Sequence, residues 1–325
     1  MSKGVCKEPV IPIKLQPKMT INELIVEFSK AGCFGAGRLA RAVDIFERML
    51  KEKALVVLGL SGAMTPAGMR QIIIDMIKEK MVDVIVTTGA NMVHDTLEAF
   101  GGTHYKGSPC VSDNKLYNYR IDRIYDIFVP EELFKSKFDE PIWQTFRDIE
   151  EKCHGKTLSS MEFMQEIGKR IKNDKSIIAT AYKQNVPIFV PAIQDSCIGL
   201  ALWEYREKKG WKEGEQTVVI DAIKELQSFF EILKKAEKIG ALLVGGGVPK
   251  NFAFQSAFKL GKPYDYAIQL TMDRPEPGGL SGATLEEAVS WGKVSERGNK
   301  VQVISDSTIC LPILVAAVME RMLRV

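Results

Sequence analysis

The apolar run ALVVLGL at residues 54–60 decides the fold of this chain. A helical pattern follows it at residues 66–80, and a second strand-like run, VDVIVTT, occupies residues 82–88. Strands that are apolar at almost every position are typical of a parallel sheet covered on both faces, and the helix between them supplies the crossover. This unit therefore predicts an α/β fold.

The same alternation of strand and helix continues to the C-terminus. Further strands are predicted at PIFVPA (187–192), TVVI (217–220), ALLVGGG (241–247), YAIQLT (266–271) and KVQVISD (300–306). Helices are predicted at 221–238 and from 308 to about 324. We expect one large, doubly wound, mostly parallel domain at residues 51–325, with an N-terminal helical extension at 1–50 and a helical insertion at about 134–173.

Composition excludes several classes of protein. The 325 residues are 46% hydrophobic and 26% charged, and the net charge of +3 is too small to indicate nucleic acid or a membrane surface as the partner. No apolar run reaches membrane-spanning length, and the N-terminus lacks the apolar core of a secretory signal. Six scattered cysteines without a CxxC pair and only three histidines predict a cytoplasmic protein with reduced thiols and no metal site.

Small and polar residues follow five of the predicted strands, in LGLSGAM, VTTGAN, VPAIQDS, VGGGVPK and VISDST. Ligands of open α/β sheets bind outside the carboxyl ends of the strands, so we expect one extended ligand there. The glycine turn in VGGGVPK opens a helix and could cradle a phosphate, or it could be a tight, closely packed turn. Asp195 and Asp306 could hold ribose hydroxyls or cap the helices that follow them. Together they favour a dinucleotide.

The stretch EAVSWGK at residues 287–293 has two interpretations. Gly292 is a typical helix end, and a lysine near the C-terminus of a helix offsets the helix dipole. The alternative is a functional pair, an indole and an amine presented together. The stretch alone does not decide between them.

Six segments in this order resemble the deoxyhypusine synthase family: MVDVIVTTGANMVHD, RIYDIFVPEELF, VPIFVPAIQDS, VGGGVPKN, LSGATLEEAVSWGK and VISDST. The resemblance runs from about residue 59 to the C-terminus, and EAVSWGK is its most specific part. It implies a Rossmann-like homotetramer with active sites at dimer interfaces. It also implies an NAD-dependent transferase, which oxidises spermidine and carries the aminobutyl group on an enzyme lysine as an imine. The acceptor is a lysine of the translation factor that carries hypusine, or putrescine in homospermidine-forming members.

The resemblance assigns roles to particular residues. Lys293 becomes the imine-forming nucleophile, which must be held as a neutral amine by burial or a neighbouring cation. Trp291 becomes an apolar wall that could also hold an ammonium by a cation–π contact, and Glu287, four residues earlier, could pair with a substrate ammonium. The implied catalytic positions are Lys293, His94 and Asn251, and the implied substrate positions are Glu287, Trp291, Leu280, Leu200, Gly278 and Val93. The implied cofactor contacts are Gly62, Ala63, Thr65, Thr88, Gly89, Ala90, Asp195, Gly246, Gly247, Ser281, Asp306 and Ser307.

The chain departs from the family pattern at five of these positions. Val93 and His94 replace two glutamates, Asn251 replaces a catalytic histidine, and Leu200 and Leu280 replace two aspartates. A buried ammonium needs a partner, so the lost carboxylates argue against spermidine bound in the familiar way. They fit a shorter or less charged amine, or a substrate with an apolar or carboxylate-bearing arm. The loop at 62–66 also reads GAMTP, where the eukaryotic pattern is closer to SNLIS.

His94 could replace the missing base, or it could be an ordinary surface or capping residue. His104 and His154 are expected at the surface.

Three hypotheses remain. The first is the transferase, with either a protein lysine or a free diamine as acceptor. The second is a net amine oxidoreductase, against which the retention of Lys293 argues. The third is a catalytically silent NAD-binding homologue, which would explain the lost carboxylates but not the intact Glu287, Trp291 and Lys293.

Overall fold

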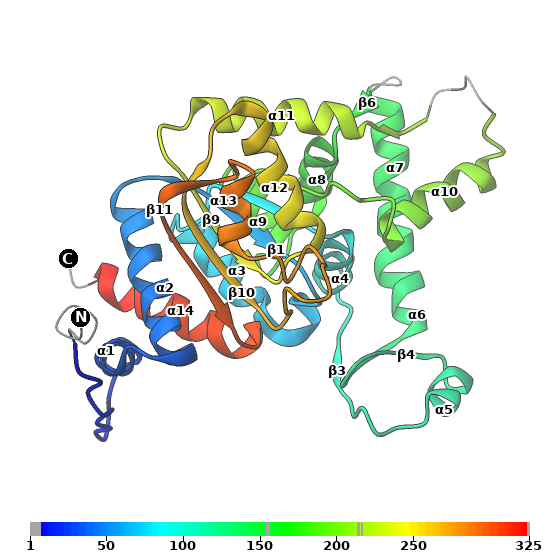
Figure 1. The fold of residues 1–325 in the computed structure, drawn as a ribbon. Helices are drawn as coiled ribbons and strands as arrows, with labels where there is room; N and C mark the ends of the chain where they lie inside the picture. The colour runs from blue at the N-terminus through cyan, green and yellow to red at the C-terminus, as the bar shows by residue number, and fades with distance from the viewer. Residues whose placement is uncertain (1–7, 154–156, 213–214, 216, 324–325) are drawn as a thin grey trace.

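Six parallel strands form the central sheet of the protein (Figure 1). The computed structural model describes residues 8–153, 157–212, 215 and 217–323. The strand order is β11-β10-β9-β1-β2-β7, so the chain winds outward from β1 in one direction and then from β9 in the other. The bounds are β1 (Leu55–Leu60), β2 (Val84–Thr87), β7 (Ile188–Phe189), β9 (Ile239–Val244), β10 (Tyr264–Thr271) and β11 (Val294–Ile304). The predicted doubly wound, parallel α/β fold is confirmed.

Helices cover both faces of this sheet, as the apolar strands require. Along β9, Leu242 and Val244 belong to one buried cluster, whereas Ala241 and Leu243 belong to the other. The first cluster contains residues of α1 (Ile21–Ala31), α2 (Phe34–Lys51), α3 (Arg70–Lys78), α4 (Gly89–Ala99), α9 (Ile177–Lys183) and α14 (Ser307–Leu323). The second contains residues of α11 (Ala222–Lys235), α12 (Gly247–Leu260) and α13 (Leu285–Ser290). The N-terminal helix α2 is thus part of the core, with Phe46 fully buried.

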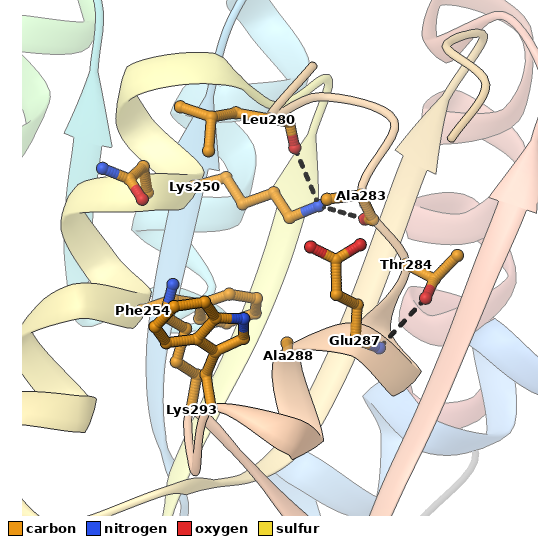
Figure 2. A pocket seen from close by; sticks show the side chains of 10 residues that line it. Lys250, Phe254, Leu280, Ala283, Thr284, Glu287, Ala288 and Lys293 are labelled. Atoms are coloured by element: carbon orange, nitrogen blue, oxygen red, sulfur yellow. Dashed lines mark hydrogen bonds between the residues drawn. The ribbon is translucent and has the colours of Figure 1, made fainter. Parts of the chain in front are cut away.

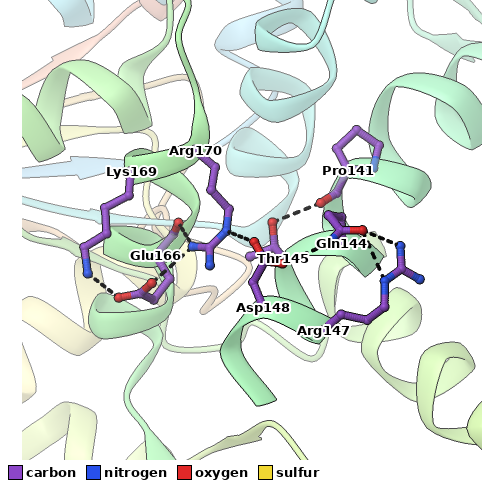
Figure 3. Close-up of polar contacts among 8 residues, drawn as sticks. All are labelled: Pro141, Gln144, Thr145, Arg147, Asp148, Glu166, Lys169 and Arg170. Carbon is purple, nitrogen blue, oxygen red and sulfur yellow. Dashed lines mark hydrogen bonds and ion pairs between the residues drawn. The ribbon is translucent and has the colours of Figure 1, made fainter. Parts of the chain in front are cut away.

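The region predicted as a helical insertion does form helices. They are α6 (Glu131–Phe134), a π-helical turn (Lys135–Asp139), α7 (Glu140–Cys153) and α8 (Ser160–Arg170). Arg170 of α8 donates through Nε to Asp148 of α7 at 2.9 Å, and it also bonds Glu166 on its own helix (Figure 3). Such partly exposed ion pairs contribute little net stability, so their main effect is to orient α8 against α7. The helix α10 (Cys197–Lys209) packs on α7.

One predicted strand lies outside the main sheet. The TVVI run forms β8 (Val219–Ile220), which pairs only with β6 (Thr157–Leu158) in a separate two-stranded sheet. Val219 is exposed, so this short run is not buried on both sides as a central strand would be. A further small sheet of β3 (Tyr105–Lys106), β5 (Ile127–Pro130) and β4 (Ile121–Ile124) projects from the body together with α5 (Asp113–Asn118) (Figure 1). None of the described helices is both long and apolar enough to cross a membrane.

Candidate active site

A small pocket of about 60 Å³ lies beside α12 and α13 (Figure 2). Its lining residues are Lys250, Asn251, Phe254, Leu280, Ala283, Thr284, Glu287, Ala288, Trp291 and Lys293. Five of them are residues that the sequence predicted for the site: Asn251, Leu280, Glu287, Trp291 and Lys293. The fold therefore brings together residues from two segments about 30 to 40 positions apart in the chain.

The end of α13 presents Trp291 and Lys293 to this pocket. Thr284 caps the helix by accepting a hydrogen bond from the backbone of Glu287 at 3.0 Å, and Gly292 ends it with a positive φ of 66°. Lys293 directly precedes β11, and its Nζ lies 5.3 Å from the centroid of the Trp291 ring, within cation–π range. The helix-ending interpretation of Gly292 is therefore confirmed, and the indole and the amine lie together. The functional role of the pair stays a prediction.

Lys250 is a second lysine of the pocket, and no role was predicted for it from the sequence. Its side chain is buried, and its Nζ donates to Gln269 Oε1 (2.9 Å), the Leu280 carbonyl (3.1 Å) and the Ala283 carbonyl (2.6 Å). The pKa of Lys250 is lowered to about 8, mainly by burial; the Glu287 carboxylate opposes this shift, and the nearby Lys293 adds to it. Its position in the first turn of α12 was the available signal, because the helix dipole disfavours a cation there.

The glycine turn after β9 packs tightly against the loop that leads to α13. A Cβ on Gly246 would lie 2.4 Å from Ser281 Cα. Gln269 holds the two segments together, since its Nε2 donates to the carbonyls of Gly245 (2.9 Å) and Ser281 (2.8 Å). The close-packing interpretation of this turn is thus supported. The cofactor role of Gly246 and Gly247 stays a prediction.

A buried amide organises the carboxyl ends of β1 and β2. Asn91 donates through Nδ2 to the Leu60 carbonyl and to Thr88 Oγ1, and its Oδ1 accepts from the backbone of Met64 (3.1 Å) and Thr65 (3.4 Å). Sequence reasoning missed Asn91, although it stands in the TTGAN segment. The loop at 62–66, which contains the predicted cofactor residues Gly62, Ala63 and Thr65, is therefore fixed to both strand ends.

A larger cleft of about 690 Å³ opens beside that loop. It is lined by Ala63 and its neighbours, by the small antiparallel sheet, and by Asp306 and Thr308 at the start of α14. Asp306 Oδ1 accepts from the backbone (2.8 Å) and the hydroxyl (2.9 Å) of Thr308, so Asp306 does cap the helix. The same carboxylate also faces a cleft of ligand size.

Comparison with known proteins decides the family. The family model for deoxyhypusine synthase matches residues 23–318. The chain belongs to the deoxyhypusine synthase family. It is 50% identical to the protein named probable deoxyhypusine synthase 1 of Methanosarcina acetivorans, over 97% of this chain and 95% of that one. It is 49% identical to the probable deoxyhypusine synthase of Methanosarcina thermophila, over 99% and 98% of the two chains.

A solved structure described as a deoxyhypusine synthase from Entamoeba histolytica shares the fold, with a TM-score of 0.65 and 18% identity over 93% of this chain and 94% of that one. Deoxyhypusine synthase relatives are aminobutyl transferases, and the chain is accordingly a transferase of alkyl groups other than methyl.

Several positions implied by the deoxyhypusine synthase pattern lie outside the Lys293 pocket. Leu200 is exposed on α10, and Val93 is buried in the core. Asp195 is exposed in the turn before α10, and that turn touches the start of α4, where a Cβ on Gly89 would lie 2.4 Å from Ser196 Oγ. The remaining positions lie in the loops that follow the strands, at Gly62, Thr88 and Gly278, or in the first turn of the helices that come next, at Ala90 and Ser307.

His94 belongs to a buried chain of polar groups rather than to the Lys293 pocket. Its Nδ1 lies 2.9 Å from His104 Nε2, and His104 Nδ1 lies 2.6 Å from Glu98, which also pairs with Arg70 at 2.6 Å. The expectation of a surface position for His104 was wrong, because the adjoining segments bury its side chain to 4% exposure. Desolvation lowers the pKa of His94 to about 4, so its ring is neutral at pH 7. His154 lies outside the described residues, and no group of three or more His, Cys, Asp or Glu side chains within those residues could hold a metal ion.

The His94 environment predicts a loss of stability in acid. The pKa of His94 is about 4 in the folded protein and near 6.5 in the unfolded chain. The contribution of His94 to the free energy of unfolding is therefore complete above pH 6.5 and is lost as the pH falls towards 4. Between pH 7.5 and 4.5 we expect His94 to account for about 2 kcal/mol of lost unfolding free energy. Urea unfolding of wild type and His94→Gln at both pH values measures this loss of unfolding free energy. An equal acid loss in the variant would contradict the assignment.

Proposed function

We propose that the chain is an NAD-dependent deoxyhypusine synthase-like transferase. It dehydrogenates a polyamine and passes the alkylamine, through an imine on Lys293, to a lysine of the hypusine-bearing translation factor. The observation that carries the proposal is the pocket in which Lys293 lies against Trp291 with Glu287 on the same wall. Family membership supports the substrate class. The comparisons favour neither a free-diamine acceptor, nor an amine oxidoreductase, nor a silent homologue.

The pocket residues supply distinct parts of the proposed chemistry. The Glu287 carboxylate attracts the substrate ammonium, and the indole of Trp291 excludes water from one side of the amine. Neutral Lys293 Nζ adds to the carbon of the dehydrogenated donor, and the remaining amine fragment leaves as this carbon becomes bound to Lys293. The acceptor amine then displaces Lys293 in the same way. NAD, when bound, takes up a hydride from the donor and returns it to the product.

The carboxyl edge of the sheet fits a dinucleotide. The cleft of about 690 Å³ is lined by Ala63 and Asp306, and the adjoining glycine turn presents backbone close to the helix start of α12. The residues that would hold the cofactor are Gly62, Ala63, Thr65, Thr88, Gly89, Ala90, Asp195, Gly246, Gly247, Ser281, Asp306 and Ser307.

A second subunit would complete the proposed site. The Lys293 pocket has only about 60 Å³, which is about two water molecules' share of liquid volume and too little to enclose a polyamine. Large apolar side chains at this pocket are exposed, with Trp291 at 55%, Leu280 at 50% and Phe258, whose ring centroid lies 6.4 Å from that of Trp291, at 48%. These features support the homotetramer with active sites at dimer interfaces that the family implies. We place the protein in the cytoplasm, with residues 51–325 as its catalytic domain.

One experiment tests the proposal. The protein is incubated with NAD and putrescine, spermidine, agmatine or cadaverine, and borohydride is added before intact-mass and peptide analysis. An adduct on Lys293 identifies the donated group. NADH without an adduct would indicate an oxidoreductase, and neither signal would indicate a silent homologue.

Restoring a carboxylate at Leu280 should increase the use of spermidine. Leu280 lines the pocket and is half exposed, so an aspartate there would face the substrate without being buried. A charge-assisted contact predicts a rise of about tenfold in kcat/KM for spermidine with Leu280→Asp. Leu200→Asp is compared in parallel. Leu200 does not line the pocket of its own chain, but the family pattern predicts that this variant also increases the use of spermidine. Flat spermidine turnover in both well-folded variants would refute this account of the pocket.

A further inference from the structure

A second cavity of ligand size lies at the amino ends of β1, β2 and β9, at the opposite edge of the sheet from the predicted cofactor cleft. This amino-edge cavity has a volume of about 510 Å³. A hollow of about 370 Å³ adjoins it, because Leu50 and Lys80 line both. Volumes of this size hold small organic ligands. The residues that line the amino-edge cavity are Leu50, Lys53, Ala54, Leu55, Val56, Lys80, Asp83, Ile232, Lys235, Ala236, Glu237 and Lys238.

Two helices end at this cavity with a lysine in a backbone conformation that favours glycine. The tripeptide KEK ends α2 and occurs again at the end of α3, and its last residues, Lys53 and Lys80, have φ of 52° and 55°. The helices α10 and α12 end with glycine in this conformation, at Gly210 and Gly261. A side chain makes the left-handed conformation costly, so the backbone does not explain the two lysines.

The ends of α2 and α3 are capped by backbone groups rather than by these lysine side chains. The Met49 carbonyl accepts from the amide of Ala54 at 3.1 Å, and the Met76 carbonyl accepts from the amide of Met81 at 2.8 Å. These bonds satisfy carbonyls that a helix end leaves without a partner. The fold therefore uses the backbone of the two KEK turns and leaves their final ammonium groups available.

Three of the four lysines at the cavity are not neutralised by a carboxylate of the fold. Within the part of the chain that the structure describes, Lys53, Lys80 and Lys235 form no ion pair, and all three are exposed. The fourth, Lys238, pairs with Glu52 at 2.5 Å. The three unpaired ammonium groups line one concave surface, which therefore attracts an anion.

Positive charge and apolar surface occur together in the amino-edge cavity. Among the described residues, its lining contains four lysines and two carboxylates, those of Asp83 and Glu237. Asp83 already accepts from the amide of Val56 at 2.8 Å, so one of its oxygens is used by the fold. The lining also includes Leu55 and Ile232, which pack against the buried cluster that contains residues of α11 and α12. The cavity thus combines a positive rim with an apolar wall.

We propose that the amino-edge cavity binds an amphipathic anion, which is a small molecule with an apolar body and one phosphate or carboxylate group. The ammonium groups of Lys53, Lys80 and Lys235 bind the anionic group, and the apolar body contacts the wall and the adjoining hollow. Methionines line that hollow, at Met81, Met319 and Met322, and their flexible side chains adapt to bodies of different shape. This site is separate from the Lys293 pocket, and the proposal does not depend on the imine chemistry.

The first test compares a complete probe with each of its halves. Calorimetric titration of the full chain at low ionic strength uses octyl phosphate, inorganic phosphate and octanol. Octyl phosphate should bind at least about tenfold more tightly than inorganic phosphate or octanol, because only octyl phosphate reaches both the lysines and the apolar wall. No binding of octyl phosphate by wild type up to about 1 mM overturns the inference.

The second test removes the two lysines without straining the fold. In the double variant Lys53→Gly, Lys80→Gly, the Kd for octyl phosphate should rise at least about tenfold. The thermal midpoint should stay the same or rise, since glycine fits both turns better than lysine does. The double variant Lys53→Arg, Lys80→Arg keeps both charges and should bind within about threefold of wild type.

Lys18→Gly is the matched control. Lys18 is also an exposed lysine with a positive φ, of 65°, but it lines neither the amino-edge cavity nor the hollow, so the affinity should not change. Wild-type affinity in the double glycine variant overturns the inference. Wild-type protein that sediments with phosphatidylglycerol vesicles but does not bind octyl phosphate in solution also overturns it, because a membrane surface and not a free anion would then be the ligand.

Discussion

Replacing Lys293 by arginine should abolish the borohydride-trapped adduct and reduce product formation on the order of a thousandfold or more. A guanidinium remains protonated and cannot form the imine, yet it keeps a cation beside the ring of Trp291. The surroundings of the residue depend on backbone contacts, since the Lys293 amide bonds the Ala288 carbonyl (2.9 Å) and its carbonyl accepts from Tyr264 (3.0 Å). The fold should therefore survive the change.

Mass spectrometry measures the loss of product, and thermal unfolding measures whether the fold of the variant survives. Lys259→Arg, an exposed lysine near the end of α12, is the control and should retain full activity. Product formation at the wild-type rate by the Lys293 variant would rule out the covalent route.

Replacing Gly246 by alanine should have the second-largest effect. The added Cβ would lie 2.4 Å from Ser281 Cα and 2.8 Å from Ser281 Cβ, which are backbone-level contacts that no rotamer change relieves. The loop cannot move away freely, because Gln269 holds the Ser281 carbonyl at 2.8 Å and Lys250 holds the neighbouring Leu280 carbonyl. We expect about 2 kcal/mol of destabilisation and at least a tenfold loss of NAD affinity.

Gly279→Ala provides a control in the same loop, since a Cβ there would have nothing within 4 Å. Calorimetric titration with NAD and thermal unfolding compare the two variants. Wild-type NAD affinity and stability in Gly246→Ala would contradict both the packing argument and the placement of the cofactor at this turn.

The main sheet was predictable because the information lies within each strand. A central parallel strand is buried on both faces, so nearly every residue must be apolar, and ALVVLGL meets this condition in one short run. The TVVI run was assigned to the wrong sheet, because the information within a strand does not include its pairing partner. Four apolar residues do not reveal which partner they pair with, and β8 pairs with β6, which lies more than 60 residues earlier.

The candidate site was predictable where a local pattern was sufficient. EAVSWGK ends a helix and presents an indole and an amine, and the family resemblance added the role of Lys293. Lys250, Asn91 and the pairing of His94 with His104 escaped prediction. Each depends on acceptors or donors from other elements or loops: Gln269 for Lys250, Leu60 and Met64 for Asn91, and His104 for His94.

The amino-acid order alone thus determined the strands of the main sheet and the helix end that carries Lys293, because hydrophobic period and capping act over a few neighbouring residues. Only the tertiary structure decided that Lys250 is a buried cation beside Lys293, that His94 is neutral within a polar chain, and that Gly246 has no room for a Cβ. Those properties arise from burial and from partners supplied by distant segments, and a linear sequence does not contain such distances.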